Sequence, residues 1–431
     1  MTPDERESPP PGPGEQAAEG SGRKAERRGI SRRTMLAGSL AALGMSALRE
    51  ARLAVAGLQE PADPTRVPGR PVSELGMRAP TESPRRVLRD GAQGVSLTPL
   101  QDLRGIVTPA DLHFERHHAG VPAVDPERWS LLIHGMVERP RVFTLEDLKR
   151  LPSVSRLWFL ECSGNGGKFY DFQADWSPQQ IDGLTSTSEW TGVPLALLFR
   201  EVGVDPAASW FLAEGMDAAV MARSIPLEKA HDDALIAYGQ NGEAIRPEQG
   251  YPARLFLPGW EGNANVKWIR RIEVADRPFM TREETSRYTD PLADGSARQF
   301  SFVMDAKSTI TFPAHPAILP DKGWWEIQGL AWSGRGRITG VEVTTDGGRS
   351  WAPARLQEPV LPRCHTRFRR LWNWRGDTAL LASRATDETG YVQPTLKQLV
   401  AARGQGTQYH NNGIRVWRVQ PDGRVFLEPE G

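Results

Sequence analysis

Apolar and polar positions alternate in short blocks through residues 96–300. Residues 129–134 and 157–160 are apolar runs of the length of single β-strands. Residues 144–148 and 193–198 have the composition and spacing of short helices. The pattern therefore predicts an α+β domain over this part of the chain.

The pattern changes in the last third of the chain, where strand-like runs are joined by tight turns. Residues 338–345 read as a strand, and the Asp-Gly-Gly sequence at 346–348 is typical of a hairpin turn. Further strand-like runs occupy residues 378–386 and 413–419. We therefore expect an antiparallel β-sandwich over residues 301–431.

The first 56 residues have the order of an export signal. Arg32 and Arg33 precede an uncharged stretch at 35–48, which is shorter than the roughly 20 residues of a membrane helix. This order predicts a twin-arginine signal over residues 1–56 and a periplasmic protein; the alternative is a buried N-terminal helix with a chance arginine pair. Residues 57–95 are rich in Pro, Gly and Arg and are expected to form an extended arm or linker.

Composition narrows the classes of partner and cofactor. The 431-residue chain has a formal net charge of zero, which gives no support for a nucleic-acid partner, and no membrane-length apolar run follows residue 60. It has two cysteines, Cys162 and Cys364, too few for a disulfide framework, a multi-cysteine zinc site, an iron–sulfur cluster or a c-type haem attachment. We therefore expect any haem to sit on another chain.

Cys162 has the most distinctive surroundings of any residue in the sequence. The apolar run 157–160 ends in Glu-Cys-Ser-Gly-Asn-Gly-Gly, so the thiol follows a buried strand and stands in a loop whose glycines allow close approach to the backbone. Such a thiol can be a nucleophile, with His113, His117 or His118 as its base, or a buried structural group, or the single protein ligand of a metal. The residues alone leave these three alternatives open.

A resemblance to a known family favours the metal. The Glu-Cys-Ser-Gly-Asn sequence at 161–165 is similar to the molybdenum-binding loop of the sulfite oxidase family, in which a cysteine and a pyranopterin dithiolene bind molybdenum. The resemblance extends from about residue 100 to the end of the chain. It implies that Cys162 is the metal ligand and that the cofactor is molybdenum-molybdopterin.

Other segments resemble family motifs in the same order along the chain, and they carry the remaining site residues. The resemblance implies cofactor-binding roles for five residues beside the cysteine: His118, Asp217, Ser224, Arg254 and Lys267. It implies catalytic roles, at the substrate anion or in proton transfer, for three: Arg116, Tyr288 and Arg370. Arginine suits an oxyanion because its planar guanidinium presents several N–H donors and stays protonated.

The resemblance also implies an architecture: a sulfite-oxidase-type molybdopterin-binding domain at 96–300, followed by an immunoglobulin-like β-sandwich dimerisation domain and hence a homodimer. Three positions depart from the usual pattern of sulfite oxidases. Gly167 stands where an arginine is usual, and Gln249 and Asn265 stand where histidines are common. A less cationic pocket favours the branch formed by the molybdenum subunits of sulfane dehydrogenases.

The expected function is therefore oxidation of sulfane sulfur bound to a carrier protein in thiosulfate oxidation, with electrons passed to a cytochrome c subunit. The main alternative is a periplasmic sulfite dehydrogenase that acts on free sulfite, and methionine sulfoxide reduction is more distant. A non-enzymatic alternative is a partner-binding protein without molybdenum. Cys364 is not expected to take part.

Overall fold

The computed structural model describes residues 66, 68–89, 94–167, 171–292, 294–404 and 408–428. The chain divides into two compact units, Met1–Arg78 and Ala79–Gly431. Within the first unit, residues 68–78 are exposed and form neither helix nor strand. The predicted signal region lies outside the described residues. The helices and strands below all belong to the second unit.

Two five-stranded sheets form the framework of the first part of the second unit. One has the order β11-β10-β7-β6, with β12 paired to β10, and the other has the order β5-β4-β13-β8-β9. The strands of the first sheet are β6 (Val154–Glu161), β7 (Thr185–Pro194), β10 (Leu235–Gln240), β11 (Glu243–Ala244) and β12 (Arg254–Phe256). Those of the second are β4 (Ser130–Gly135), β5 (Arg141–Thr144), β8 (Trp210–Gly215), β9 (Ala222–Pro226) and β13 (Ile269–Ala275). The pair β4 and β13 is parallel, whereas the other pairs of these sheets are antiparallel.

Smaller elements surround these sheets. The short strands are β1 (Val87–Leu88), β2 (Val95–Leu97), β3 (Glu115–Arg116), β14 (Asp290–Pro291) and β15 (Ala297–Arg298). The α-helices are α2 (Leu145–Arg150), α3 (Pro178–Asp182), α4 (Leu195–Val202), α5 (Leu227–Asp232), α6 (Arg282–Thr285) and α7 (Leu396–Arg403), and the 3-10 turns include Ala110–Leu112, Pro247–Gln249 and Gly262–Ala264. Strand β1 falls in the segment that the sequence predicts as an extended arm, where it pairs with β2.

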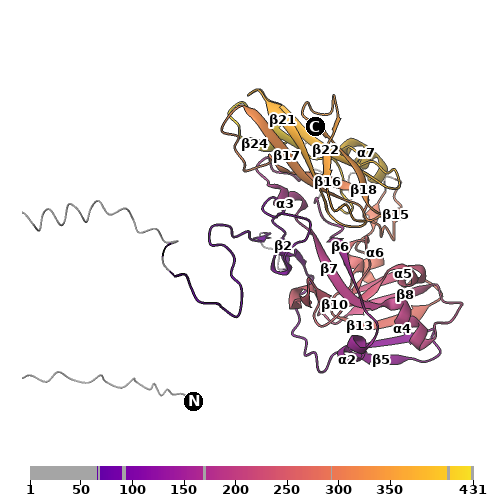
Figure 1. Cartoon of the computed structure of the whole chain (residues 1–431). Helices are drawn as coiled ribbons and strands as arrows, with labels where there is room; N and C mark the ends of the chain where they lie inside the picture. Colours follow the sequence, from indigo (N-terminus) through magenta and orange to yellow (C-terminus); the bar gives the residue numbers. More distant parts are fainter. Residues whose placement is uncertain are drawn as a thin grey trace, which may run out of the picture. The chain divides into compact units, whose positions relative to one another are not determined.

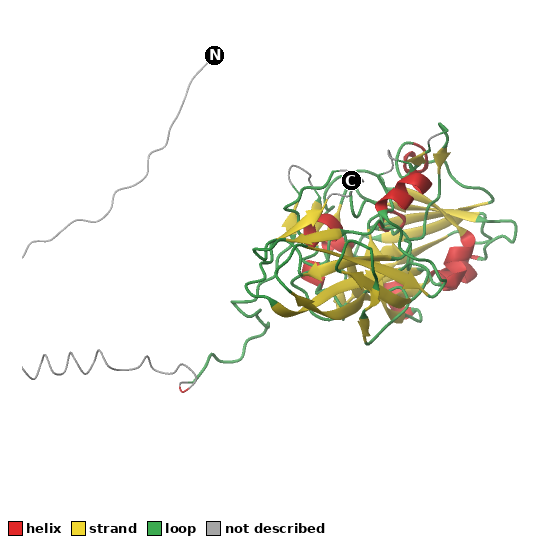
Figure 2. Ribbon diagram, turned by 90° about the horizontal axis from the view of Figure 1, so that it is seen from above, coloured by secondary structure: helices red, strands yellow, loops and turns green. Residues whose placement is uncertain are grey.

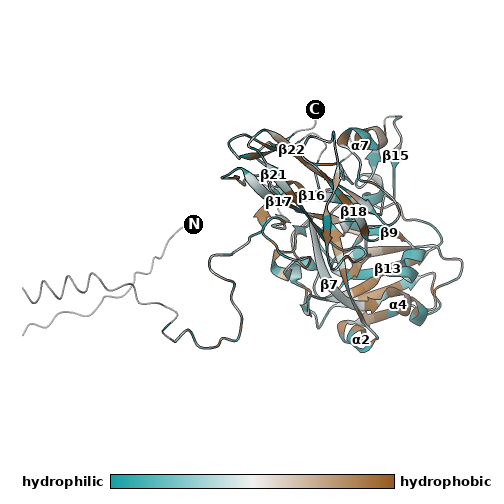
Figure 3. Cartoon of the chain, turned by 45° about the horizontal axis from the view of Figure 1, so that its top comes forward, coloured by the Kyte–Doolittle hydropathy of each residue, from teal (hydrophilic) through white to brown (hydrophobic). Residues whose placement is uncertain are grey.

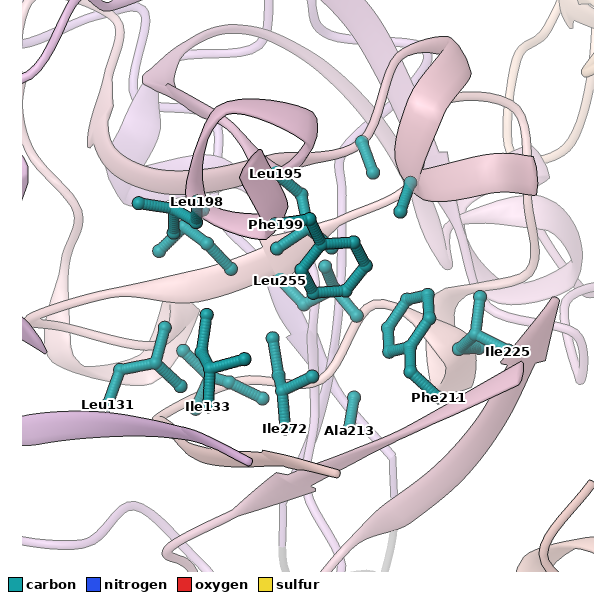
Figure 4. Close-up of a cluster of buried hydrophobic side chains, with 14 of the residues drawn as sticks. Leu131, Ile133, Leu195, Leu198, Phe199, Phe211, Ala213, Ile225, Leu255 and Ile272 are labelled. Atoms are coloured by element: carbon teal, nitrogen blue, oxygen red, sulfur yellow. The ribbon is translucent and has the colours of Figure 1, made fainter. Parts of the chain in front are cut away.

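The part of the second unit that contains the two five-stranded sheets is called the first domain below. Helix α4 covers its core on one side. It ends at Gly203, whose left-handed backbone (φ +68°) closes the last turn. Figure 4 shows Leu198 and Phe199 of this helix in the same apolar cluster as Ile272 of β13, and all three are fully buried. Burying a side chain of this size stabilises the fold by about 1.5–3 kcal/mol. Figure 3 shows both hydrophobic and hydrophilic residues along α4, as expected for a helix with one face on a core.

The C-terminal part of the unit is a two-sheet β-sandwich, drawn in orange and yellow in Figure 1. One sheet has the order β16-β17-β21-β20, and the other has the order β19-β18-β22-β23-β24. The strands are β16 (Lys307–Phe312), β17 (Gly323–Trp332), β18 (Ile338–Thr344), β19 (Ala352–Pro353), β20 (Arg355–Gln357), β21 (Thr366–Trp374), β22 (Ala379–Asp387), β23 (Val416–Val419) and β24 (Val425–Glu428). Every pair is antiparallel, and Ile327, Phe368 and Trp417 are fully buried between the sheets.

The predicted order of an α+β domain followed by a β-sandwich is confirmed, with strands predominating in both parts (Figure 2). The hairpin predicted at 346–348 is present, and its return strand begins at β19, because Asp346 accepts hydrogen bonds from the backbone and hydroxyl of Ser350 and extends the turn. Within the described residues, no helix is both long and apolar enough to cross a membrane.

Candidate active site

Cys162 follows directly on strand β6, whose last residues are fully buried. Its backbone N–H donates to the carbonyl of Leu184 (3.0 Å), and its carbonyl accepts from Asn165 (2.9 Å), so both ends of the peptide are fixed. Gly262 packs against the same peptide, and a Cβ at that position would lie 3.2 Å from the Cα of Cys162. Burial raises the pKa of the Cys162 thiol, against the effect of the nearby Arg116 guanidinium.

Glu161, the residue before the cysteine, is anchored by the C-terminal domain. Its Oε2 accepts from the indole N–H of Trp332 (2.7 Å), and its Oε1 lies 3.3 Å from Nζ of Lys307. The same ammonium group lies 2.9 Å from Asp182 Oδ1. All four side chains are buried, so removal of one partner would leave an uncompensated charge in the protein interior. The C-terminal domain therefore supports the strand end that presents the thiol.

The glycines after Cys162 explain part of this packing. At Gly166 the backbone is left-handed (φ +90°), and a Cβ there would lie 2.5 Å from Nη2 of Arg415 and 2.9 Å from the carbonyl oxygen of Asn411. The sequence indicates that a bulky group approaches this loop; the group that approaches Gly166 is the C-terminal domain of the chain. At Gly167 a Cβ would have no neighbour within 4 Å among the described residues.

A cavity of about 650 Å³ opens beside the thiol. Seven of the predicted site residues line it: Arg116, His118, Cys162, Asp217, Arg254, Lys267 and Tyr288. Its other lining residues are Phe114, His117, Leu160, Met221, Gln249, Gly262, Asn263, Asn265, Val266 and Trp268. Residues predicted from segments up to 172 positions apart in sequence therefore meet at one site.

Buried positive groups form one wall of the cavity. Arg254 is fully buried and donates to the carbonyls of Gln249 (3.0 Å) and Asn265 (2.8 Å), while its Nε has no partner within the described part of the chain. Nζ of Lys267 donates to the carbonyl of Glu248 (2.9 Å) and lies 2.6 Å from Nδ1 of His117. Burial, together with the charge of Arg254, holds the pKa of Lys267 well below its usual range. Buried groups of this kind favour an anionic ligand, which would accept their hydrogen bonds and balance their positive charge.

On another wall, Nε2 of His118 lies 2.7 Å from the hydroxyl of Tyr288. Burial and the charge of Arg116 lower the pKa of His118 to about 4, so the ring is neutral at neutral pH, and in the tautomer protonated at Nδ1 its Nε2 accepts from the phenol. Burial raises the pKa of Tyr288, which keeps the phenol protonated. The pair can therefore hold a proton inside the cavity and pass it on.

Asp217 and Ser224 lie on the turn and strand that follow β8. Asp217 lines the cavity, and its Oδ1 accepts from the backbone N–H of Met221 (3.1 Å), which fixes the turn before β9. Ser224 lies on β9 but does not line the cavity: its hydroxyl accepts from the backbone of Phe279 (3.0 Å), and its N–H donates to Glu284 (3.1 Å). In this structure Ser224 therefore links β9 to residues 279 and 284 and does not face the cavity.

The expectation that Arg370 contacts the substrate is not supported, because the structure does not bring it to the cavity. Arg370 lies on β21 in register with the buried Ile327, and its Nη1 donates to the carbonyl of Pro353 (2.8 Å) within the sandwich. The motif predicts which domain holds this arginine, but the position of its side chain depends on strand register, which the motif does not specify.

The sequence did not identify a second buried network beside the cavity. Arg223 donates to Glu284 (2.6 Å) and Glu261 (3.1 Å), and Glu261 in turn lies 3.1 Å from Nε2 of His410. The guanidinium of Arg223 also stands 5.3 Å above the ring of Tyr288. The Arg-Ser-Ile-Pro sequence at 223–226 is a signal that could have pointed to this arginine; no local signal marks His410.

Among the described residues, no group of three or more His, Cys, Asp or Glu side chains is arranged to hold a metal ion.

Two family models match the chain in succession. The oxidoreductase molybdopterin binding domain matches residues 118–283, and the Mo-co oxidoreductase dimerisation domain matches residues 298–417. The two models therefore cover the domain that contains most of the cavity and the β-sandwich that supports it.

A solved structure is similar over nearly its whole length. The crystal structure of the sulfane dehydrogenase SoxCD from Paracoccus pantotrophus has 44% sequence identity and a TM-score of 0.75, covering 86% of this chain and 95% of that chain. The chain is also 32% identical over 337 residues to the NADH nitrate reductase of Solanum lycopersicum, and 30% identical over 373 residues to that of Ulva prolifera. These alignments cover 67% and 75% of the chain but 36% and 42% of the nitrate reductases.

Proposed function

Because the chain belongs to the sulfite oxidase family of molybdopterin oxidoreductases, we propose that it oxidises sulfane sulfur held on a carrier protein. The observation that carries this proposal is the 44% identity to a sulfane dehydrogenase over 95% of that chain. The chain spans about two fifths or less of the nitrate reductases it matches, so their activity is a weaker guide.

The residues of the cavity fit the molybdenum cofactor. A soft thiol at Cys162 suits molybdenum, and the positive wall of Arg254 and Lys267 suits the phosphate of a pterin. The unpartnered Nε of Arg254 is a donor that such an anion would satisfy. When bound, the cofactor supplies two-electron oxidation with transfer of an oxygen atom derived from water to the sulfur.

The side chains of this protein bind and orient the substrate beside that centre. Arg116 is half-buried at the cavity wall, and its charge already influences both Cys162 and His118, so it is the group that receives the anionic end of the substrate. The hydroxyl of Tyr288 is hydrogen-bonded to Nε2 of His118, and its proton can turn toward an oxygen that gains charge on sulfur. Apolar neighbours such as Phe114 and Trp268 exclude water from the cavity.

The preference for a carrier-bound substrate over free sulfite rests on Gly167. Members of this family usually have an arginine at this position, whereas glycine has no side chain, and a Cβ here would have no neighbour within 4 Å in the part of the chain that the structure describes. A sulfur atom attached to a protein needs more room and bears less compact charge than sulfite, so the absence of this arginine side chain suits it.

We propose further that the electrons leave to a separate cytochrome c subunit, because neither Cys162 nor Cys364 stands in a haem-attachment motif. The match to a dimerisation domain supports a homodimer. Export to the periplasm through the twin-arginine signal at residues 1–56 remains part of the proposal and is tested by locating the protein in cell fractions.

The decisive experiment measures reduction of cytochrome c by the purified protein with sulfite alone, and with thiosulfate plus the carrier proteins. We expect turnover that depends on the carrier. Rapid turnover of sulfite alone would instead identify a sulfite dehydrogenase, and reduction of nitrate with an artificial electron donor would overturn both. Folded protein that lacks molybdenum and pterin by elemental and fluorescence analysis would favour a partner-binding protein.

A further inference from the structure

The segment 408–412 crosses from the C-terminal domain onto the cysteine loop. The backbone N–H of His410 donates to the carbonyl of Ser163 (2.7 Å), one residue beyond the thiol. The side chain of Asn411 donates to the carbonyls of Gly166 and Gly167 (3.3 Å each). The last part of the chain thus borders the site at a point that the family motifs do not mark.

Tyr409 stands at this border. Its ring centroid lies 5.1 Å from that of Tyr288, with the planes tilted by 45°. Tyr288 lines the cavity and bonds to His118, so the two tyrosines form a continuous aromatic surface that begins inside the cavity. Tyr409 is half-buried, and its hydroxyl has no partner among the residues that the structure describes. The partial exposure of this ring allows it to contact a ligand.

The position of Tyr409 is fixed from both sides. His410 is buried (4% exposed), lies in the left-handed region (φ +57°) and is held through Nε2 by Glu261. Tyr288 is also left-handed (φ +50°), and Arg223 stands over its ring. Residues other than glycine adopt this conformation uncommonly, and strained positions of this kind cluster at active sites and ligand-binding sites. The aromatic surface is thus a rigid one, preorganised before a ligand arrives.

We propose that Tyr409 is a specificity-determining residue that packs against the peptide or thiol arm of a substrate whose sulfur is attached to a protein. The inference rests on the proposed function. A compact anion such as sulfite has no carbon framework to place on this ring, whereas a sulfur carried on a polypeptide brings methylene and amide groups with it. A flat aromatic ring with a free hydroxyl can pack on the former and donate to the latter.

The test compares kcat/KM for the carrier-bound substrate with kcat/KM for free sulfite in the wild type and in Tyr409→Leu. Leucine keeps apolar volume but removes the ring face and the hydroxyl. We expect the value for the carrier to fall about tenfold, mainly through KM, while the value for sulfite changes less than about twofold. Tyr409→Phe keeps the ring and should recover most of the loss. Tyr391→Leu is the matched control, because this tyrosine of the same domain bonds to Asn412.

An equal fall for both substrates, or no fall for either, would overturn the role of Tyr409 while leaving the proposed function intact. Wild-type protein that does not oxidise the carrier-bound sulfur would overturn the proposed function and the inference with it. The molybdenum content of each variant shows whether the site is loaded, and the unfolding midpoint shows whether the fold is intact. If Tyr409→Leu loses either, two other variants provide the same comparison. The ratio of kcat/KM for the carrier-bound substrate to kcat/KM for sulfite should then be unchanged in Tyr409→Phe and lowered in Tyr409→His.

Discussion

Nε2 of His118 lies 2.7 Å from the phenol oxygen of Tyr288, and both side chains line the cavity beside the thiol. Replacing Tyr288 by Phe removes the one proton that this pair shares but keeps the ring. We predict that kcat falls by about 100-fold while KM changes little, since the hydroxyl acts on charge that develops during the reaction. Steady-state kinetics measure this, with Tyr391→Phe as the control. An unchanged kcat would exclude proton transfer by Tyr288.

Replacing Cys162 by Ser should remove the molybdenum and abolish activity while leaving the fold intact, because a hydroxyl is a much harder ligand than a thiolate. The control is Cys364→Ser. The Cys364 thiol donates to the carbonyl of Leu157 (2.8 Å), a bond that serine can also make. Metal analysis and the unfolding midpoint distinguish the two variants, and retention of molybdenum by Cys162→Ser would refute the ligand assignment.

Replacing Lys307 by Met should destabilise the protein by about 3–5 kcal/mol, because Glu161 and Asp182 would remain buried without their shared cation. The ammonium of Lys307 and the guanidinium of Arg415 hold the pKa of Asp182 below its usual range although burial opposes them. Denaturant unfolding measures the loss. Lys397→Met, at an exposed position on α7, should change stability by less than about 0.5 kcal/mol.

The outer face of the four-stranded sheet is predicted to form the homodimer. Trp324 is 70% exposed and Leu371 is 65% exposed, and they are diagonal neighbours on this face. Leu371→Asp should convert a dimer to a monomer, as measured by sedimentation. Val142→Asp places the same charge at an exposed apolar residue of the first domain and should leave the dimer intact.

Stability should fall in mild acid because of two buried histidines. Burial lowers the pKa of both His113 and His365 to about 3, whereas an unfolded histidine titrates near 6.5. The unfolded chain therefore binds more protons between these values, so the stabilisation is complete above pH 6.5 and is lost as the pH falls. Each histidine contributes up to about 1.4 kcal/mol per pH unit in this window. Unfolding free energies of the wild type and His365→Gln, measured from pH 7 to 4, should differ in slope by that amount.

Local sequence predicted those elements whose signals are local. Thr144 caps α2, since its hydroxyl accepts from the backbone of Asp147 (3.1 Å), and the apolar run at 157–160 is part of β6. Family motifs went further and assembled most of the cavity, because each motif combines a residue type with a position along the chain. The seven lining residues that were predicted came from this source rather than from periodicity.

Tertiary packing determined the rest. Asn411 bonds to the carbonyl of Gly166 across 245 positions, and no pattern near either residue indicates this contact. Tyr409 and His410 were missed for the same reason. Arg370 illustrates the reverse case: its motif is recognisable, but the structure places its guanidinium on the carbonyl of Pro353 and not at the cavity. Sequence motifs identified chemistry more reliably than they identified which side chains meet.

The contact of Arg415 and Asn411 with Gly166 has a consequence for how the protein is made. These residues leave the ribosome after the first domain, yet they support the loop that carries the thiol. A nascent chain that has completed only its first domain lacks this support, so cofactor insertion should follow synthesis and folding of the whole chain. A truncation of the final strands would then appear in the cell as a protein without molybdenum before it appeared as one without a dimer.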